Sequence, residues 1–126
     1  MPLVHHELCF GCGRTNLFGL LLDVVRDGPD AVSGRCFIKQ DHQGADRGFA
    51  HDGVVGAALA EAMALACGLD ARAVSFEASF EEPAPVGAFL EVQARVDGRD
   101  GLLTHASATA TADQRIVARA QGRFRS

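Results

Sequence analysis

Near its middle this chain has a helix-forming run that is apolar on nearly every side. Residues 53–67 read GVVGAALAEAMALAC, and Glu61 is their only charge. Ala, Leu and Met favour a helix, for which Asp52 is the expected N-cap and Gly68 the expected end. A helix that is apolar all round must be buried on most sides. Because the sequence shows no second helix, strands must cover the predicted helix 52–67.

Segments of alternating apolar and polar residues lie on both sides of this helix, a pattern typical of strands with one buried face. Before the helix, residues 20–26 and 31–39 predict a hairpin. After it, four more strands are expected, over residues 74–81, 90–97, 102–112 and 115–124. Their short connections favour antiparallel neighbours. The apolar positions of the last two strands are mostly Ala and Gly, so the helix can approach them closely.

These elements follow each other as ββ-loop-α-ββββ in 126 residues, a length suited to one domain with one core. We therefore predict an α+β chain that forms a single domain over residues 1–126. A curved antiparallel sheet of five or six strands should wrap around one long central helix, which is the architecture of the hotdog fold. The open sheet face and the sheet edges favour pairing with a second copy, so a homodimer or tetramer is expected.

Composition argues against several classes of partner. The chain holds 12 Lys and Arg against 16 Asp and Glu, giving a formal net charge of -4, which disfavours nucleic acid and anionic membranes. No run approaches the roughly 18 apolar residues of a membrane span, and the N-terminus does not resemble a signal peptide. The four cysteines are therefore expected as reduced thiols in the cytoplasm.

Residues 1–19 form a Cys- and Gly-rich segment ahead of the first strand. Cys9 and Cys12 make a CxxC pair, which can supply half of a tetrahedral zinc site. A second pair with matching spacing is missing, because the other two cysteines fall in a predicted strand and in the predicted helix. His5 or His6 would close the site only by a tight local wrap or in a partner. The expectation is therefore no metal and no cofactor, with the CxxC turn packed on the helix or on a dimer interface.

Several short motifs occur in order along the chain. The first is CFGCG at 9–13, followed by Asn16, Gly19 and Leu20. The later ones are HQG at 42–44, Gly48, HDG at 51–53, AALAEAM at 57–63 and FEEPAPVG at 80–87. Together they resemble one branch of the hotdog acyl-CoA thioesterases. The resemblance implies hydrolysis of a small, aryl or medium-chain acyl thioester carried by CoA or by a carrier protein.

Two positions depart from the pattern of that branch. Where the branch has His-Gly-Gly, this chain has His51, Asp52 and Gly53. The catalytic carboxylate of the branch lies nine residues after the histidine, and this chain has Ala60 there. The carboxylate that remains is the next residue, Glu61.

Thioester hydrolysis needs a carboxylate, as nucleophile or as base for water, and a backbone N–H that polarises the carbonyl. Glu61, and after it Asp52, are the candidate catalytic carboxylates. The N–H groups of Asp52 and Gly53 at the helix start are the candidate carbonyl donors. Structural alternatives stay open, because Glu61 can instead bond the N-terminal segment or a partner subunit and Asp52 can simply cap the helix.

Four residues are the candidate substrate contacts: His42, His51, Gly53 and Asn16. The two histidines flank the predicted helix start, and either can instead be structural. Gly53 and Asn16 belong to the motifs that carry the resemblance.

Two other functions compete with hydrolysis. A hotdog hydratase or dehydratase would use Glu61 with His42 or His51, because the segment from Gly56 through Glu61 also resembles the helix start of hydroxyacyl-carrier-protein dehydratases. The loop lacks their His-Phe-Pro-Gly pattern. A non-catalytic acyl-CoA-binding domain is the third reading, prompted by Ala60. The acyl group, its carrier and the pathway do not follow from the sequence.

Overall fold

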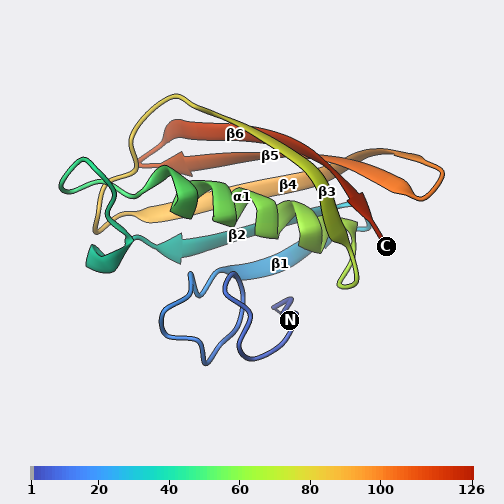
Figure 1. Cartoon of the computed structure of the whole chain (residues 1–126), viewed down its shortest axis with the longest axis horizontal. Coiled ribbons are helices and arrows are strands. Elements are labelled where there is room, and N and C mark those ends of the chain that lie inside the picture. Colours follow the sequence, from blue (N-terminus) through green and yellow to red (C-terminus); the bar gives the residue numbers. More distant parts are fainter. Residues whose placement is uncertain (1) are drawn as a thin grey trace.

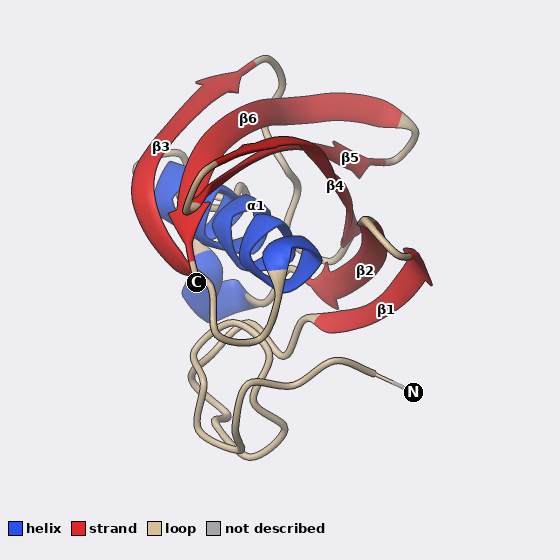
Figure 2. Ribbon diagram, turned by 90° about the vertical axis from the view of Figure 1, so that its right-hand side faces the viewer, coloured by secondary structure: helices blue, strands red, loops and turns tan. Residues whose placement is uncertain are grey.

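The computed structural model describes residues 2–126 and contains one antiparallel sheet that curves around a helix (Figures 1 and 2). The helix is α1 (Asp52–Cys67), preceded by the short 3-10 helix η1 (Gln40–His42). The strands are β1 (Asp23–Gly28), β2 (Ala31–Phe37), β3 (Arg72–Phe80), β4 (Phe89–Asp100), β5 (Leu103–Ala112) and β6 (Arg115–Arg125). Their order in the sheet is β1-β2-β4-β5-β6-β3. The predicted wrapped-helix architecture is confirmed.

The sheet encloses α1 because small side chains line the middle of its concave face. On β5 and β6 the inward residues are mostly Ala, and Ala106, Ala110 and Ala118 are each at most 1% exposed. Alternate residues of β4, such as Leu90 and Val92, complete the concave face under the helix. Figure 2, which looks along the helix, shows the strands arching over α1 from β3 to β1. The apolar character of α1 on most sides therefore matches its surroundings.

The N-terminal segment covers the side of α1 that the sheet leaves open (Figure 2). Leu3 donates its N–H to the Val24 carbonyl at 2.7 Å, and Cys12 is fully buried. The residues before β1 thus complete the core.

No helix within residues 2–126 combines the length and the apolar character needed to cross a membrane.

The first strand begins later than the pattern predicted. Residues 20–22 are bonded to the N-terminal segment, since the N–H groups of Leu20 and Leu22 donate to the carbonyls of Phe10 and Gly11, both at 2.8 Å. Leu21 between them has a φ of 52°, a left-handed backbone that no strand continues. The apolar run starting at Leu20 therefore belongs to the core, while the strand itself starts at Asp23.

The expected N-cap is also shifted by one residue. His51 is the cap, with extended backbone angles (φ -60°, ψ 140°), and its Nδ1 accepts the Gly53 N–H at 2.8 Å. Asp52 is the first helical residue instead. An imidazole nitrogen can cap a helix because, like the oxygen of Ser or Asp, it accepts a hydrogen bond from the first turn. The end of the helix at Gly68 is as predicted.

Candidate functional site

A cleft of about 180 Å³ opens beside the first turn of α1. Its walls come from the loop before α1, from the end of β3 with the turn that follows, and from Val117 of β6. His51 and Asp52 lie at its helix side, while Phe49, Val55 and Phe80 supply apolar surface. The cleft therefore combines an apolar wall with the positive end of a helix dipole.

The first turn of α1 presents one unused backbone donor at this cleft. The Gly53 N–H donates to His51 Nδ1, and the N–H groups of Val54 and Val55 donate to the His51 carbonyl at 2.9 and 3.3 Å. Within residues 2–126, no acceptor is bonded to the Asp52 N–H. The Gly53 N–H, a candidate carbonyl donor from the sequence, is thus already bonded to the capping residue His51. The donor that remains available is the Asp52 N–H.

The Asp52 carboxylate lies at the same position. The residue is exposed and sits in the first turn, where the helix dipole stabilises a negative charge. Asp52 therefore brings a carboxylate and a free N–H to the edge of one cleft.

His42 does not line the cleft, and instead it bonds the loop that precedes α1. Its carbonyl accepts the His51 N–H at 2.8 Å, and its Nδ1 accepts the Lys39 N–H at 3.0 Å. Its Nε2 is buried without a partner among residues 2–126. Burial, aided by the positive charge of Lys39, lowers the pKa of the imidazole below its ordinary value. His42 is therefore a neutral group that holds the loop against the helix start.

Asn16 shapes the N-terminal loop. Its Nδ2 donates to the Leu8 carbonyl and its Oδ1 accepts the Phe18 N–H, both at 3.1 Å. It does not belong to the lining of the cleft described above.

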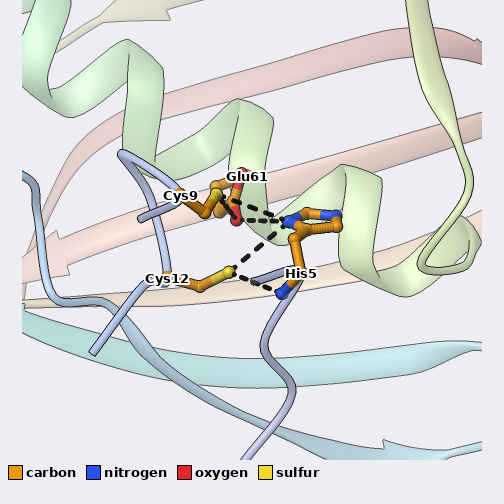
Figure 3. A group of neighbouring side chains, drawn as sticks. All are labelled: His5, Cys9, Cys12 and Glu61. Carbon is orange, nitrogen blue, oxygen red and sulfur yellow. Dashed lines mark hydrogen bonds and ion pairs between the residues drawn. The ribbon is translucent and has the colours of Figure 1, made fainter. Parts of the chain in front are cut away.

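Glu61 does not line the cleft and lies in a second group, with His5, Cys9 and Cys12 (Figure 3). Glu61 follows Asp52 by nine positions, a separation of about 13.5 Å along the helix axis and a net half turn around it. Glu61 Oε2 lies 2.9 Å from His5 Nδ1 and 3.3 Å from Cys9 Sγ. The hydratase reading required Glu61 beside His42 or His51, whereas its histidine neighbour is His5.

The remaining member of this second group is Cys12, whose Sγ lies 3.4 Å from His5 Nδ1. Burial, followed by the hydrogen bond to Glu61, raises the pKa of the Cys12 thiol to about 12. Burial likewise raises the pKa of the Cys36 and Cys67 thiols to about 11. With pKa values this high, these three thiols are neutral at pH 7, and so are poor nucleophiles. All four cysteines are free.

Comparison with known proteins finds similar structures, while the sequence comparisons find no match. No protein-family profile matches the chain, and no curated protein sequence matches it. Many solved structures share the arrangement of a sheet wrapped around one helix. One is the PaaI protein of Escherichia coli, from its phenylacetic acid degradation operon, with 20% identity over 85% of this chain and 84% of that chain and a TM-score of 0.78.

The chain has the hotdog fold. Other hotdog proteins that it resembles are AziG of S. sahachiroi, with 25% identity over 84% and 90% of the two chains and a TM-score of 0.76, and thioesterase superfamily member 2 of zebrafish, with 15% identity over 82% and 80% and a TM-score of 0.74. The predicted resemblance to the hotdog thioesterase superfamily is thus confirmed for the fold. At these identities the likeness concerns the fold, and the roles of single residues must be argued from this chain.

Proposed function

We propose that this protein is an acyl-CoA or acyl-carrier thioesterase that holds the substrate carbonyl at the start of α1. Its thioesterase-superfamily neighbours support this class of reaction. The observation that carries the proposal is the pairing, in Asp52, of an unused helix-start N–H with a carboxylate at the same cleft.

In the proposed reaction the thioester carbonyl oxygen accepts the Asp52 N–H, where the helix dipole favours the negative charge that develops. The Asp52 carboxylate takes a proton from water, and the water oxygen bonds to the carbonyl carbon. The tetrahedral intermediate then collapses with cleavage of the carbon–sulfur bond. The proton on Asp52 passes to the departing thiolate, so the products are a carboxylic acid and a free thiol.

Glu61 is not assigned as the base in this proposal. Its Oε2 is engaged by His5 and Cys9, and it lies about 13.5 Å along the helix from Asp52. At the family position of the carboxylate the chain has Ala60, which cannot transfer a proton. Asp46, Asp52 and Glu82 all line the cleft, and Asp52 is the one that bears both a carboxylate and the free donor.

The dimensions of the cleft favour a small or aryl acyl group. At about 180 Å³ it is smaller than the roughly 300–1,000 Å³ of pockets that enclose drug-sized ligands. Phe49, Val55 and Phe80 would contact the apolar part of the acyl group.

We also propose that the protein acts as a homodimer, in the cytoplasm. The edge strand β3 exposes Val74, Phe76 and Phe80, and such an apolar edge favours a second copy. Because Phe80 also lines the cleft, the second copy would border the substrate.

The test is release of free thiol from short, long and aryl acyl-CoAs by three proteins: native, Asp52→Asn and Glu61→Gln. Loss of the base should lower kcat by at least about 100-fold in Asp52→Asn, with its Tm nearly unchanged because the residue is exposed. Glu61→Gln should keep kcat within a few-fold, assayed below its own Tm. Loss of activity in Glu61→Gln with full activity in Asp52→Asn would overturn the assignment.

A binding function without turnover is the second candidate, and Ala60 is the observation that favours it. In that case acyl-CoA binds to the native protein, as seen by calorimetry, with no thiol released. Ala60→Asp would then restore the carboxylate of the resembling branch, and thiol release by this variant would show that only this group was missing.

A further inference from the structure

Four side chains with metal-binding atoms meet where the N-terminal segment crosses α1 (Figure 3). They are His5, Cys9 and Cys12 from the segment and Glu61 from the helix. One nitrogen, two sulfurs and one oxygen all lie within 4.8 Å of one another. Cys12 is fully buried, while the side chains of His5 and Glu61 are 17% and 14% exposed. The group is therefore shielded from solvent and contains two sulfurs.

Three of the six distances between these atoms match the edges of a tetrahedron around one cation. With zinc bonds of about 2.0–2.3 Å, the corners of such a tetrahedron lie about 3.3–3.8 Å apart. His5 Nδ1 lies 3.6 Å from Cys9 Sγ and 3.4 Å from Cys12 Sγ, and Cys9 Sγ lies 3.3 Å from Glu61 Oε2. The His5–Glu61 pair, at 2.9 Å, is shorter because it is hydrogen-bonded, and it would open by about 0.5 Å around a cation.

Two backbone features support the same reading. The His5 N–H donates to Cys12 Sγ at 3.1 Å, which holds this sulfur beside the imidazole of the same histidine. Gly11, between the two cysteines, lies so close to Glu61 that an added Cβ would meet its Cδ at 2.4 Å. The CxxC turn can therefore reach the helix carboxylate only because this residue has no side chain.

We propose that His5, Cys9, Cys12 and Glu61 bind one divalent zinc ion in a closed, four-ligand structural site. Thiolate, imidazole and carboxylate ligands in a tetrahedron favour zinc over the oxygen-seeking magnesium and calcium. Each thiol releases one proton to solvent on binding, and the imidazole proton resides on Nε2 so that Nδ1 faces the ion. Two thiolates and one carboxylate more than balance the charge of the cation. The ion would fasten the N-terminal segment to α1.

This proposal departs from the expectation of no metal that the cysteine spacing gave. The sequence offers no second pair of cysteines with matching spacing. In the structure His5 lies beside the CxxC turn, as a tight local fold of the segment requires, and Glu61 of α1 supplies the fourth metal-binding atom.

The experiment measures metal content and affinity, without any assay of activity. The native protein, purified under reducing conditions without chelator, should carry close to one zinc per chain by elemental analysis. After the zinc is removed with a chelator, cobalt should restore a one-to-one complex with the visible bands of tetrahedral cobalt and a thiolate charge-transfer band. Added zinc should displace the cobalt and raise the Tm.

Cys9→Ser tests the site, and Cys36→Ser is the matched control, since Cys36 is a buried cysteine outside the group. Cys9→Ser should lose part of the charge-transfer intensity, because Cys12 still supplies one thiolate. Its zinc affinity should fall by more than the roughly 10–100-fold that is typical when a residue outside the ligand set is changed. Cys36→Ser should bind as the native protein does. Glu61→Gln, if Cys9→Ser does not fold, should also weaken binding while leaving both thiolate ligands in place.

Three outcomes would overturn the proposal. One is native protein that takes up no zinc after reconstitution under reducing conditions. Another is a Cys9–Cys12 disulfide in protein purified without air, which would make the pair a redox couple. The third is an unchanged zinc affinity in Glu61→Gln, which would show that Glu61 is not a ligand. Since none of these readings involves thioester, failure of the zinc site and failure of the proposed hydrolysis are distinguished.

Discussion

His5 Nδ1 lies 2.9 Å from Glu61 Oε2, although the two residues are 56 positions apart in the chain. The contact joins the start of the N-terminal segment to the one charged residue within the apolar run of α1. A carboxylate so largely removed from water is costly unless it is paired. The position of the N-terminal segment therefore depends on Glu61, and that of Glu61 on the segment.

Gly11→Ala should separate these two elements. The new methyl group would meet Glu61 Cδ at 2.4 Å, so the carboxylate must move away from His5. We expect a loss of about 1–3 kcal/mol in the free energy of unfolding, as for other overpacked sites, measured by urea denaturation. Gly98→Ala is the control, since a Cβ there meets nothing within 4 Å. Equal stability of the two variants would contradict the close packing at Gly11.

The buried His42 should make the protein less stable in mild acid. Its pKa is lowered by burial in the folded state, so below its ordinary value of 6.5 the unfolded chain binds the proton more readily. Stability should therefore be fully present above that value and decrease as the pH falls toward the folded pKa. His42→Asn, which keeps an acceptor for the Lys39 N–H, should show a smaller decrease between about pH 7.5 and 5.5 in urea denaturation. The exposed His6→Asn should retain the native slope, and an unchanged slope in His42→Asn would refute the assignment.

Ala110→Leu should disturb the packing of β5 against α1. Ala110 is fully buried on the concave face of the sheet, where only small residues allow the helix its close approach. Three further heavy atoms should cost about 1–3 kcal/mol of unfolding free energy, measured by thermal or urea denaturation. Thr109→Leu changes the neighbouring residue on the outer face and should cost less than about 0.5 kcal/mol. A larger loss of unfolding free energy in Thr109→Leu would mean that side chains are packed more tightly on the convex face than on the concave face.

Val74→Glu should abolish the proposed homodimer. The substitution places a charge on the exposed apolar edge of β3, where burial against a second copy would leave it unpaired. Sedimentation should give twice the chain mass of 13.3 kDa for the native protein and 13.3 kDa for the variant. Val25→Glu is the matched control, because Val25 is an exposed valine on the other edge strand, β1. A native protein that sediments only at 13.3 kDa would exclude the dimer.

The fold was predictable because its signals are local. Alternation along β4, β5 and β6 and the apolar run of α1 each depend on residues a few positions apart, and each buried face agrees with its neighbours. The limits of β1 were not predictable, because the apolar run from Leu20 includes residues that bond to the N-terminal segment. The cap was also misplaced, since capping statistics favour Asp52 over His51 and only the loop geometry makes His51 the cap.

The sequence proposes residues of the candidate site by their type, and it does not predict how they are grouped. From the residue pattern alone it follows that one apolar helix needs a sheet around it, and that Glu61, Asp52 and the CxxC pair are the chemically notable groups. The three-dimensional packing was needed to show that Asp52 lines a cleft while Glu61 contacts His5 and Cys9. The physical reason is distance along the chain: neighbours within a few residues follow from backbone periodicity, whereas contacts across about 50 positions depend on how the whole core closes.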